Sequence, residues 1–418
     1  MDKNIDVIEN VYQTLKSINS HMEKKYPDKK WLTDPVVKYF ELVHEGVAEG
    51  KPLLWYFFCL PPEIFRAMDV TTFSAEYACG VMASLGDISL KYFDLANVKI
   101  PDHVCTVNIF PVGLVSSGET LTPDLFLAGA QNPCDSAITA YSNLAYCDGI
   151  PSFFLDIPYI ANDRAYKYVG KQFEAMVAFV EEQTGQRLDM DRLREVIRHS
   201  NKAQQYFLKL NDLRRNIPSP SSSRGLYIAG GAMMGLAGIP EFTEWIKNRY
   251  EAAKEMVEKG EGAIPEEKVR LVWIANGVDF DLGIFEWLEN KFGAVTVASL
   301  LNAYPSEPLC DSEDESEIFK SLAHRIMNYP MGRHGRGSAD FYIEECIRVA
   351  EDYKADAVIF AGNVGCKWNW AVAQLVKNSI QDALGIPTLA IQLDPWDPRF
   401  VSLDVIKEKF AQFFELML

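Results

Sequence analysis

Two hydrophobic periodicities alternate along this chain. Residues 4–25 carry apolar side chains at three- and four-residue spacing, which predicts an amphipathic helix, and a second helix is expected to follow and to end near Gly50. Residues 52–60 form a continuous apolar run, typical of a buried strand, and Val70–Ser74 predicts another. From there to residue 159 short apolar runs alternate with helical stretches, as in βαβ units.

The pattern then changes and later returns. Residues 162–215 are polar, charged and helically periodic, and predict two long helices broken near Gly185; a charged helix is expected from Pro240 to about Glu261. Alternation resumes at residue 268 and continues to the end. We therefore predict a helical N-terminal segment (1–50), an α/β lobe (51–161), a helical middle region (162–265) and a second α/β lobe (266–418), each lobe a Rossmann-like parallel sheet.

The two predicted lobes share an internal repeat. Asp124 opens an apolar run that leads to Cys134, a helical stretch, Gly-Ile-Pro, a second apolar run and another Asp; Asp356 opens the same succession around Cys366. In both copies the Asp precedes the Cys by ten positions. Each copy predicts a strand, a loop with the Cys, a helix and a second strand. Each copy should therefore place one thiol at the carboxyl end of a parallel strand, where open α/β sheets bind their ligands.

The repeated cysteines favour a metal centre. A thiol at a helix N-terminus meets the positive end of the helix dipole and free backbone N–H groups, and both favour the thiolate that binds metal. Cys105 is a third candidate, upstream of the first repeat. Three thiolates on an iron–sulfur cubane would leave one iron open. Zinc and simple burial remain alternatives for these cysteines. The simply buried interpretation is preferred for Cys59, Cys79, Cys147, Cys310 and Cys346.

The composition of the chain indicates which kinds of partner and which cellular compartment are expected. The chain has 418 residues and 48% hydrophobic residues, enough for sizeable cores, and its net charge of −17 argues against a nucleic-acid partner. The first six residues show no basic region before an apolar core, and no segment is long and apolar enough to span a membrane, so we expect a cytoplasmic protein without a signal peptide. In a reducing compartment its eight cysteines are metal ligands, reactive thiols or buried residues rather than disulfides.

Other motifs carry less information. No P-loop sequence occurs, and the Gly-rich stretch 230–235 is interpreted as close helix packing rather than a nucleotide site. The basic stretch 331–337 is expected to be a flexible, exposed turn, with an anionic ligand as the alternative. Glu63 and Glu76 lie next to predicted strands. Glu76 is flanked by small and apolar residues, which would raise its pKa and suit it to act as a base, whereas an exposed loop acid is the plainer alternative.

At these residues the chain resembles the 2-hydroxyacyl-CoA dehydratase family, which includes the class I benzoyl-CoA reductases. The resemblance runs from about Trp55 to the C-terminus and depends on the order and spacing of short pieces. These pieces are Trp55–Ile64, Val104-Cys105, Cys134, Ile150-Pro151 through Tyr159, Pro218–Pro220, Glu267–Leu271, Gly365–Trp368, Gly385–Pro387 and Asp397–Arg399.

The resemblance implies a two-subunit enzyme of strict anaerobes that holds one [4Fe-4S] cluster in each subunit through three cysteines, here Cys105, Cys134 and Cys366. It further implies a second homologous subunit or another copy of this chain, an acyl-CoA thioester substrate, and a separate ATP-hydrolysing iron–sulfur activator that delivers one low-potential electron. In the dehydratases, reduction of the thioester gives a ketyl radical anion that expels the hydroxyl group and then loses a β-proton. Glu76 is the glutamate of this chain that matches the acid–base residue of the family.

One feature departs from the family pattern. The dehydratases have a small hydroxyl residue shortly before Pro-x-Glu, where this chain has Phe58 and Cys59. The departure leaves room for a low-potential reductase of the same family, or for a larger double-cubane cluster joined by Cys59 or Cys79. A third hypothesis is a bilobal small-molecule-binding protein with structural cysteines.

Overall fold

The structure is a computed structural model that describes residues 6–86, 89–120, 122–130 and 132–417. Residues 4 and 5 of the first predicted helix, and nearly all of the N-terminal stretch considered for a signal peptide, lie outside the described residues. Within the described part, no helix combines the length and the apolar character needed to cross a membrane.

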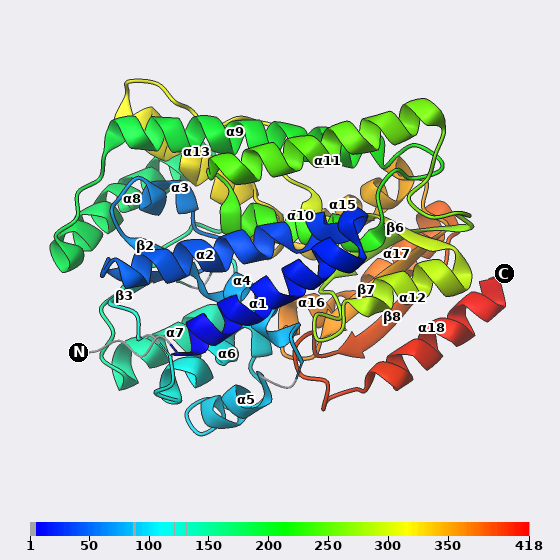
Figure 1. Cartoon of the computed structure of the whole chain (residues 1–418), viewed down its shortest axis with the longest axis horizontal. Helices are drawn as coiled ribbons and strands as arrows, with labels where there is room; N and C mark the ends of the chain where they lie inside the picture. The colour runs from blue at the N-terminus through cyan, green and yellow to red at the C-terminus, as the bar shows by residue number, and fades with distance from the viewer. Residues whose placement is uncertain (1–5, 87–88, 121, 131, 418) are drawn as a thin grey trace.

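Two four-stranded parallel sheets form the framework, which confirms the predicted α/β class (Figure 1). The first sheet has the order β2-β1-β3-β4 and the second the order β6-β5-β7-β8. The two orders are equivalent strand by strand, so the internal repeat corresponds to a repeated topology. The strands are β1 (Leu53–Tyr56), β2 (Thr71–Ser74), β3 (Leu125–Gly129), β4 (Ser152–Leu155), β5 (Val269–Ala275), β6 (Ala294–Ser299), β7 (Ala357–Asn363) and β8 (Thr388–Leu393).

Helices precede and surround the first sheet. The N-terminal helices α1 and α2 pack on each other, and α2 contacts β2 (Figure 1). The helices up to the end of the first lobe are α1 (Asp6–Lys25), α2 (Asp34–Ala48), α3 (Pro62–Arg66), α4 (Ala75–Ala83), α5 (Leu90–Ala96), α6 (Thr106–Ser116) and α7 (Asp135–Cys147), with a 3-10 turn at Pro27–Leu32.

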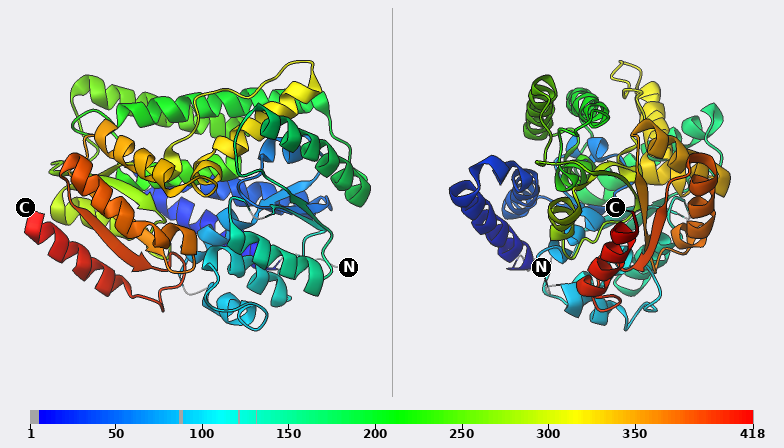
Figure 2. Two further views of the ribbon diagram at one scale, coloured as in Figure 1. Left: turned by 180° about the vertical axis from the view of Figure 1, so that it is seen from behind. Right: turned by 90° about the vertical axis from the view of Figure 1, so that its right-hand side faces the viewer.

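The middle region is helical, as its periodicity predicts. Its helices are α8 (Asp163–Thr184), α9 (Met190–Leu213), α10 (Ser223–Leu236) and α11 (Pro240–Lys259). The long helices α9 and α11 lie side by side along one edge of the molecule, and the view from behind shows the same arrangement (Figures 1 and 2). In α10, Gly230 faces the Asn302 side chain and Gly235 faces the Tyr77 ring, so the Gly-rich stretch serves close packing. The boundaries proposed between the four segments stay a prediction.

Helices cover both faces of the second sheet, with α12 (Gly283–Phe292) and α18 (Leu403–Met417) on one face and α15 (Ala339–Asp352) and α17 (Ala373–Leu384) on the other. The short helix α16 (Lys367–Ala371) follows β7, whereas α13 (Glu315–Asn328) packs on α8 and on α14 (Pro330–His334). Side chains alternate along each strand, so Leu271 and Ile359 pack against α12 and α18, whereas Val272 and Val358 pack against α15 and α17. A strand that is buried on both faces is mostly apolar, which is why these strands appear in the sequence as short, largely apolar runs.

The repeated Asp has a structural role in both sheets. The Asp124 carboxylate accepts the backbone N–H of Leu53 at 2.6 Å, and the Asp356 carboxylate accepts that of Arg270 at 2.7 Å. Each Asp thereby ties the start of its own strand to the start of the neighbouring strand. Gly149 and Gly385 end the helices that follow, with φ angles of 67° and 70°, a conformation that glycine adopts without strain. The repeat therefore encodes where strands and helices begin and end.

Candidate metal centre

Each of the three predicted cysteine ligands lies immediately before a helix. Cys134 follows β3 and precedes α7, Cys366 follows β7 and precedes α16, and Cys105 precedes α6. Two helix N-termini from the first lobe and one from the second therefore each carry a sulfur. Cys105 is buried and the other two are partly exposed.

The structure brings these three cysteines into one neighbourhood. Burial raises the pKa of the Cys105 thiol most strongly, and the charges of Cys366 and Cys134 raise it further. Burial and then Cys366 raise the pKa of Cys134 to about 12. The backbone at Gly365 also lies in close contact with that of Cys105. A methyl group added at Gly365 would lie only 2.5 Å from the Cys105 Cα atom. The sulfurs are thus close enough to influence one another's ionisation.

The helix N-termini favour the thiolate form of these cysteines, as expected, but this effect does not outweigh burial in the cysteines on their own. Backbone N–H groups of the following helices do lower the pKa of all three thiols, but burial raises it more. Three neighbouring sulfurs that repel one another as anions need a cation between them to become thiolates together. The donor set therefore suits a positively charged iron–sulfur core better than a set of free thiolates.

Two asparagines donate hydrogen bonds to these sulfurs. The Asn363 Nδ2 group lies 3.1 Å from the Cys105 Sγ atom, and the Asn108 Nδ2 group lies 3.5 Å from the Cys134 Sγ atom. N–H donors toward sulfur are a recurrent part of the surroundings of iron–sulfur clusters. Sequence analysis missed both residues. The available signal was an amide at the end of the apolar β7 run, and an Asn three residues after each of Cys105 and Cys366.

Several buried polar atoms beside the cysteines lack a partner among the described residues. They are Asn108 Oδ1, Ser136 Oγ and Asn369 Oδ1. Each belongs to the first turn of a helix that a candidate cysteine precedes. Buried polar groups are ordinarily paired, so their clustering here is consistent with a site that binds a further group.

The same described residues contain no set of three or more His, Cys, Asp or Glu side chains arranged to hold a metal ion. The three sulfurs influence one another electrostatically without converging on one point. Such spacing does not disqualify a polynuclear cluster, because its ligands bind different metal atoms and stand farther apart than ligands of one ion.

Glu76 lies in the first turn of α4 and is buried, so the alternative of an exposed loop acid is wrong. Burial raises the pKa of its carboxyl to about 7, against the opposing effect of its hydrogen bonds. Oε1 accepts the Tyr141 hydroxyl, and Oε2 accepts the backbone N–H of Phe58 at 3.1 Å. Tyr141 belongs to α7, the helix that Cys134 precedes, and the charge of Cys134 contributes to its raised pKa. The carboxyl therefore lies near the cysteine site, and its pKa is close to neutral.

The remaining cysteines divide into two groups. Cys59, Cys79 and Cys346 are buried, as predicted, whereas Cys147 is exposed and Cys310 is partly exposed, so the burial prediction is wrong for these two. Beyond the effect of burial, the charges of Glu76 and Cys134 raise the pKa of Cys59, and Glu76 alone is the charged neighbour that raises the pKa of Cys79. Cys59 thus lies closer to the candidate site than Cys79 does.

Two other candidates have structural roles. The Glu63 carboxylate is buried, accepts the Ser200 hydroxyl at 2.5 Å, and forms an ion pair with Arg325 at 3.3 Å. The basic stretch 331–337 is not an exposed flexible turn: His334 and Arg336 are buried, and part of the stretch forms α14. Arg336 donates to three backbone carbonyls, those of Gly332, Tyr159 and Met327, which explains how a basic residue is accommodated there.

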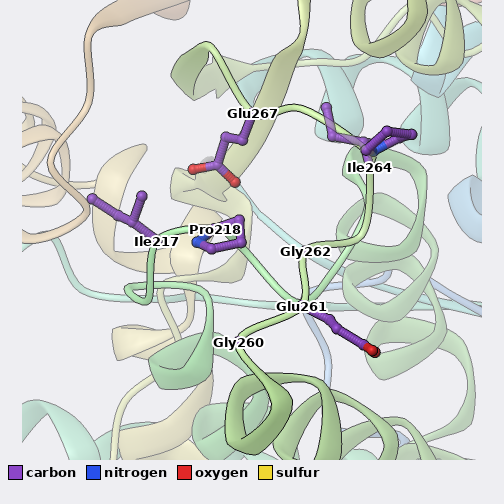
Figure 3. A pocket seen from close by; sticks show the side chains of 8 residues that line it. Ile217, Pro218, Gly260, Glu261, Gly262, Ile264 and Glu267 are labelled. Atoms are coloured by element: carbon purple, nitrogen blue, oxygen red, sulfur yellow. The ribbon is translucent and has the colours of Figure 1, made fainter.

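One cavity lies away from these residues. It has a volume of about 510 Å³. Figure 3 shows that it lies between Ile217-Pro218, the turn Gly260–Gly262 and Glu267. It lies just before β5, at the amino end of the second sheet, whereas Cys366 follows the carboxyl end of β7. The Glu267 carboxylate already accepts the Ser219 backbone N–H at 2.6 Å and pairs with Arg270. Of the two glutamates that line this cavity, Glu261 and Glu267, the carboxylate of Glu267 is therefore already engaged within the protein.

Two parallel-sheet lobes of equal topology, with neighbouring cysteines at helix N-termini, define a bilobal α/β protein with a candidate metal centre between its lobes. Residues 57–417 match the family model described as 2-hydroxyglutaryl-CoA dehydratase, D-component, and the chain belongs to this family.

Curated relatives are similar at low identity but over most of the chain. A subunit of the benzoyl-CoA reductase of Thauera aromatica is 24% identical over 76% of this chain and 77% of its own length. The (R)-phenyllactyl-CoA dehydratase alpha subunit of Clostridium sporogenes is 23% identical over 85% of this chain and 87% of its own. The alpha subunit of (R)-2-hydroxyglutaryl-CoA dehydratase of Acidaminococcus fermentans is 23% identical over 70% of this chain and 64% of its own. These relatives are named as subunits of dehydratases, which are lyases, and of a reductase.

Proposed function

We propose that this chain is the iron–sulfur subunit of a radical 2-hydroxyacyl-CoA dehydratase-type enzyme, with Cys105, Cys134 and Cys366 as ligands of a [4Fe-4S] cluster. The observation that carries the proposal is the gathering of these three thiols from both lobes, each before a helix, within a chain that belongs to the dehydratase family. When bound, such a cluster supplies an open iron as a Lewis acid and one low-potential electron.

Glu76 is the proposed acid–base residue of this reaction. Dehydration of a 2-hydroxyacyl thioester through its ketyl radical anion requires removal of a β-proton. A carboxyl with a pKa of about 7 is suited to accept that proton and to release it again. Tyr141 and the Phe58 N–H each donate to one carboxyl oxygen, which holds the group in one orientation.

The proposed assembly follows the relatives, each of which is named as one subunit of its enzyme. A second homologous subunit, or another copy of this chain, would complete the enzyme. Because no P-loop sequence occurs in this chain, ATP would be hydrolysed by a separate iron–sulfur activator, and the substrate would be an acyl-CoA thioester.

A low-potential reductase of the same family is the second candidate. Cys59 favours it, because this thiol stands where dehydratases carry a hydroxyl, is buried, and is influenced by Glu76 and Cys134. The same position would allow Cys59 to join a larger iron–sulfur cluster. Similarity to a subunit of a benzoyl-CoA reductase agrees with this alternative.

One assay decides between the two candidates. The anaerobic protein is incubated with its partner subunit, activator, ATP, reductant and a 2-hydroxyacyl-CoA. A dehydratase forms the enoyl-CoA with only catalytic amounts of reductant, because the electron is recycled, whereas a reductase consumes reductant in proportion to product. A protein with neither activity toward any acyl-CoA, and without iron, would instead fit a bilobal binding protein.

A further inference from the structure

Asn363 is held in one orientation between the two lobes. It is the last residue of β7 and is 1% exposed. Its Oδ1 atom accepts the backbone N–H of Gly365 at 2.8 Å. Because that N–H can only donate, the amide oxygen must face Gly365, and the Nδ2 group must face the Cys105 Sγ atom, 3.1 Å away. A residue of the second lobe thus donates a hydrogen bond to a candidate ligand of the first.

Asn108 provides a second bond of the same kind. It lies three residues after Cys105, is 2% exposed, and its Nδ2 group donates to the Cys134 Sγ atom at 3.5 Å. Neither asparagine side chain donates to the sulfur of the cysteine closest to it in sequence. Asn108 bonds Cys134 rather than Cys105, and Asn363, three residues before Cys366, bonds Cys105. These crossed bonds connect the polypeptide segments that carry the three thiols.

Asn369 offers an internal comparison. It lies three residues after Cys366, as Asn108 lies three residues after Cys105, and it is 6% exposed. Its side-chain Nδ2 group, however, donates to the Tyr342 hydroxyl at 3.1 Å and not to a sulfur. The three asparagines therefore share residue type, burial and proximity to a cysteine, but only Asn108 and Asn363 donate to sulfur through their side chains.

We propose that Asn363 and Asn108 are positioning residues that raise the reduction potential of the cluster by donating hydrogen bonds to the sulfurs of Cys105 and Cys134. This proposal rests on the proposed function, because it requires a cluster on these sulfurs. A reduced cluster carries one more negative charge than an oxidised one, partly on its sulfur ligands. An N–H donor at those sulfurs stabilises the reduced state more than the oxidised state.

The experiment compares three leucine variants, Asn363→Leu, Asn108→Leu and, as the matched control, Asn369→Leu. Leucine resembles asparagine in shape but has no donor. Iron and acid-labile sulfide are measured first in the anaerobic wild-type protein, then the midpoint potential is determined for each protein by redox titration followed by electron paramagnetic resonance. We expect the equilibrium constant for reduction to fall about tenfold for each donor removed and to stay unchanged in Asn369→Leu.

The outcomes are separable. A lower potential in both variants, with an unchanged control, supports the proposal. Unchanged potentials in both variants, or an equal fall in the control, overturn it. Loss of iron from both variants but not from the control also overturns it, because the asparagines would then serve to hold the site rather than to tune it. Absence of iron and sulfide from the wild-type protein refutes the proposed function, and this inference with it.

Discussion

The free energy of unfolding of the chain should depend on the ionisation of the buried Glu76 carboxyl. Replacing it by glutamine keeps the side-chain shape but removes the ionisation. In the folded chain the pKa of Glu76 is about 7, raised by burial from the ordinary value of 4.5. Since one pKa unit corresponds to about 1.4 kcal/mol, ionised Glu76 destabilises the folded state by about 3 kcal/mol relative to the protonated form.

The sign of the pH dependence follows from these two values. Below about pH 4.5 the carboxyl is protonated in both the folded and the unfolded chain, and its contribution to stability is fully present. As the pH rises toward 7 the unfolded chain releases the proton more readily, so that contribution is lost. Above pH 7 both states are ionised and the loss is complete.

Urea unfolding of the chain freed of iron, at pH 5, 6, 7 and 8, measures this effect. We compare the free energy of unfolding of Glu76→Gln with that of the wild type. The difference, variant minus wild type, should increase between pH 5 and 7 by the larger part of about 3 kcal/mol, and should then level off. Glu174→Gln is the matched control, because the Glu174 side chain is exposed in the folded chain and its replacement should leave the pH dependence unchanged. A difference that stays constant from pH 5 to 8 would refute the burial argument.

Three further predictions address other parts of the structure. Glu76→Gln should retain its iron but lose turnover, and turnover at the wild-type rate would remove this residue from the mechanism. Gly365→Ala places a methyl group 2.5 Å from the Cys105 Cα atom and should lower the free energy of unfolding by about 1–3 kcal/mol; Gly231→Ala, which has room for a methyl group, should cause no loss. Arg325→Met leaves Glu63 buried without its cation and should cost about 3–5 kcal/mol in urea unfolding, so a cost below about 1 kcal/mol would show that the ion pair is unimportant.

Much of the fold could be predicted because its signals are local. Strand β1 (Leu53–Tyr56) lies within the predicted apolar run 52–60, since a strand that is buried on both faces is mostly apolar. The glycine of Gly-Ile-Pro in each repeat copy marks the end of a helix and the approach to the next strand. Such short-range rules are visible in the sequence.

The surroundings of the site could not be predicted because they depend on contacts between distant residues. The bond from Asn363 to Cys105 joins positions 258 residues apart, and the bond from Arg325 to Glu63 joins positions 262 apart. Composition also misled the interpretation of residues 331–337, where glycines and arginines are typical of an exposed turn. The carbonyls that bind Arg336, including that of Tyr159, were not foreseeable.

The central claim is that Cys105, Cys134 and Cys366 hold an iron–sulfur cluster, and iron and sulfide analysis of anaerobically purified protein tests it most directly. We predict about four irons and four sulfides per chain with a brown colour, lost in Cys134→Ser and Cys366→Ser and retained in Cys310→Ser. Equal iron content in the wild type and all three variants, or no iron in any of them, would contradict the claim.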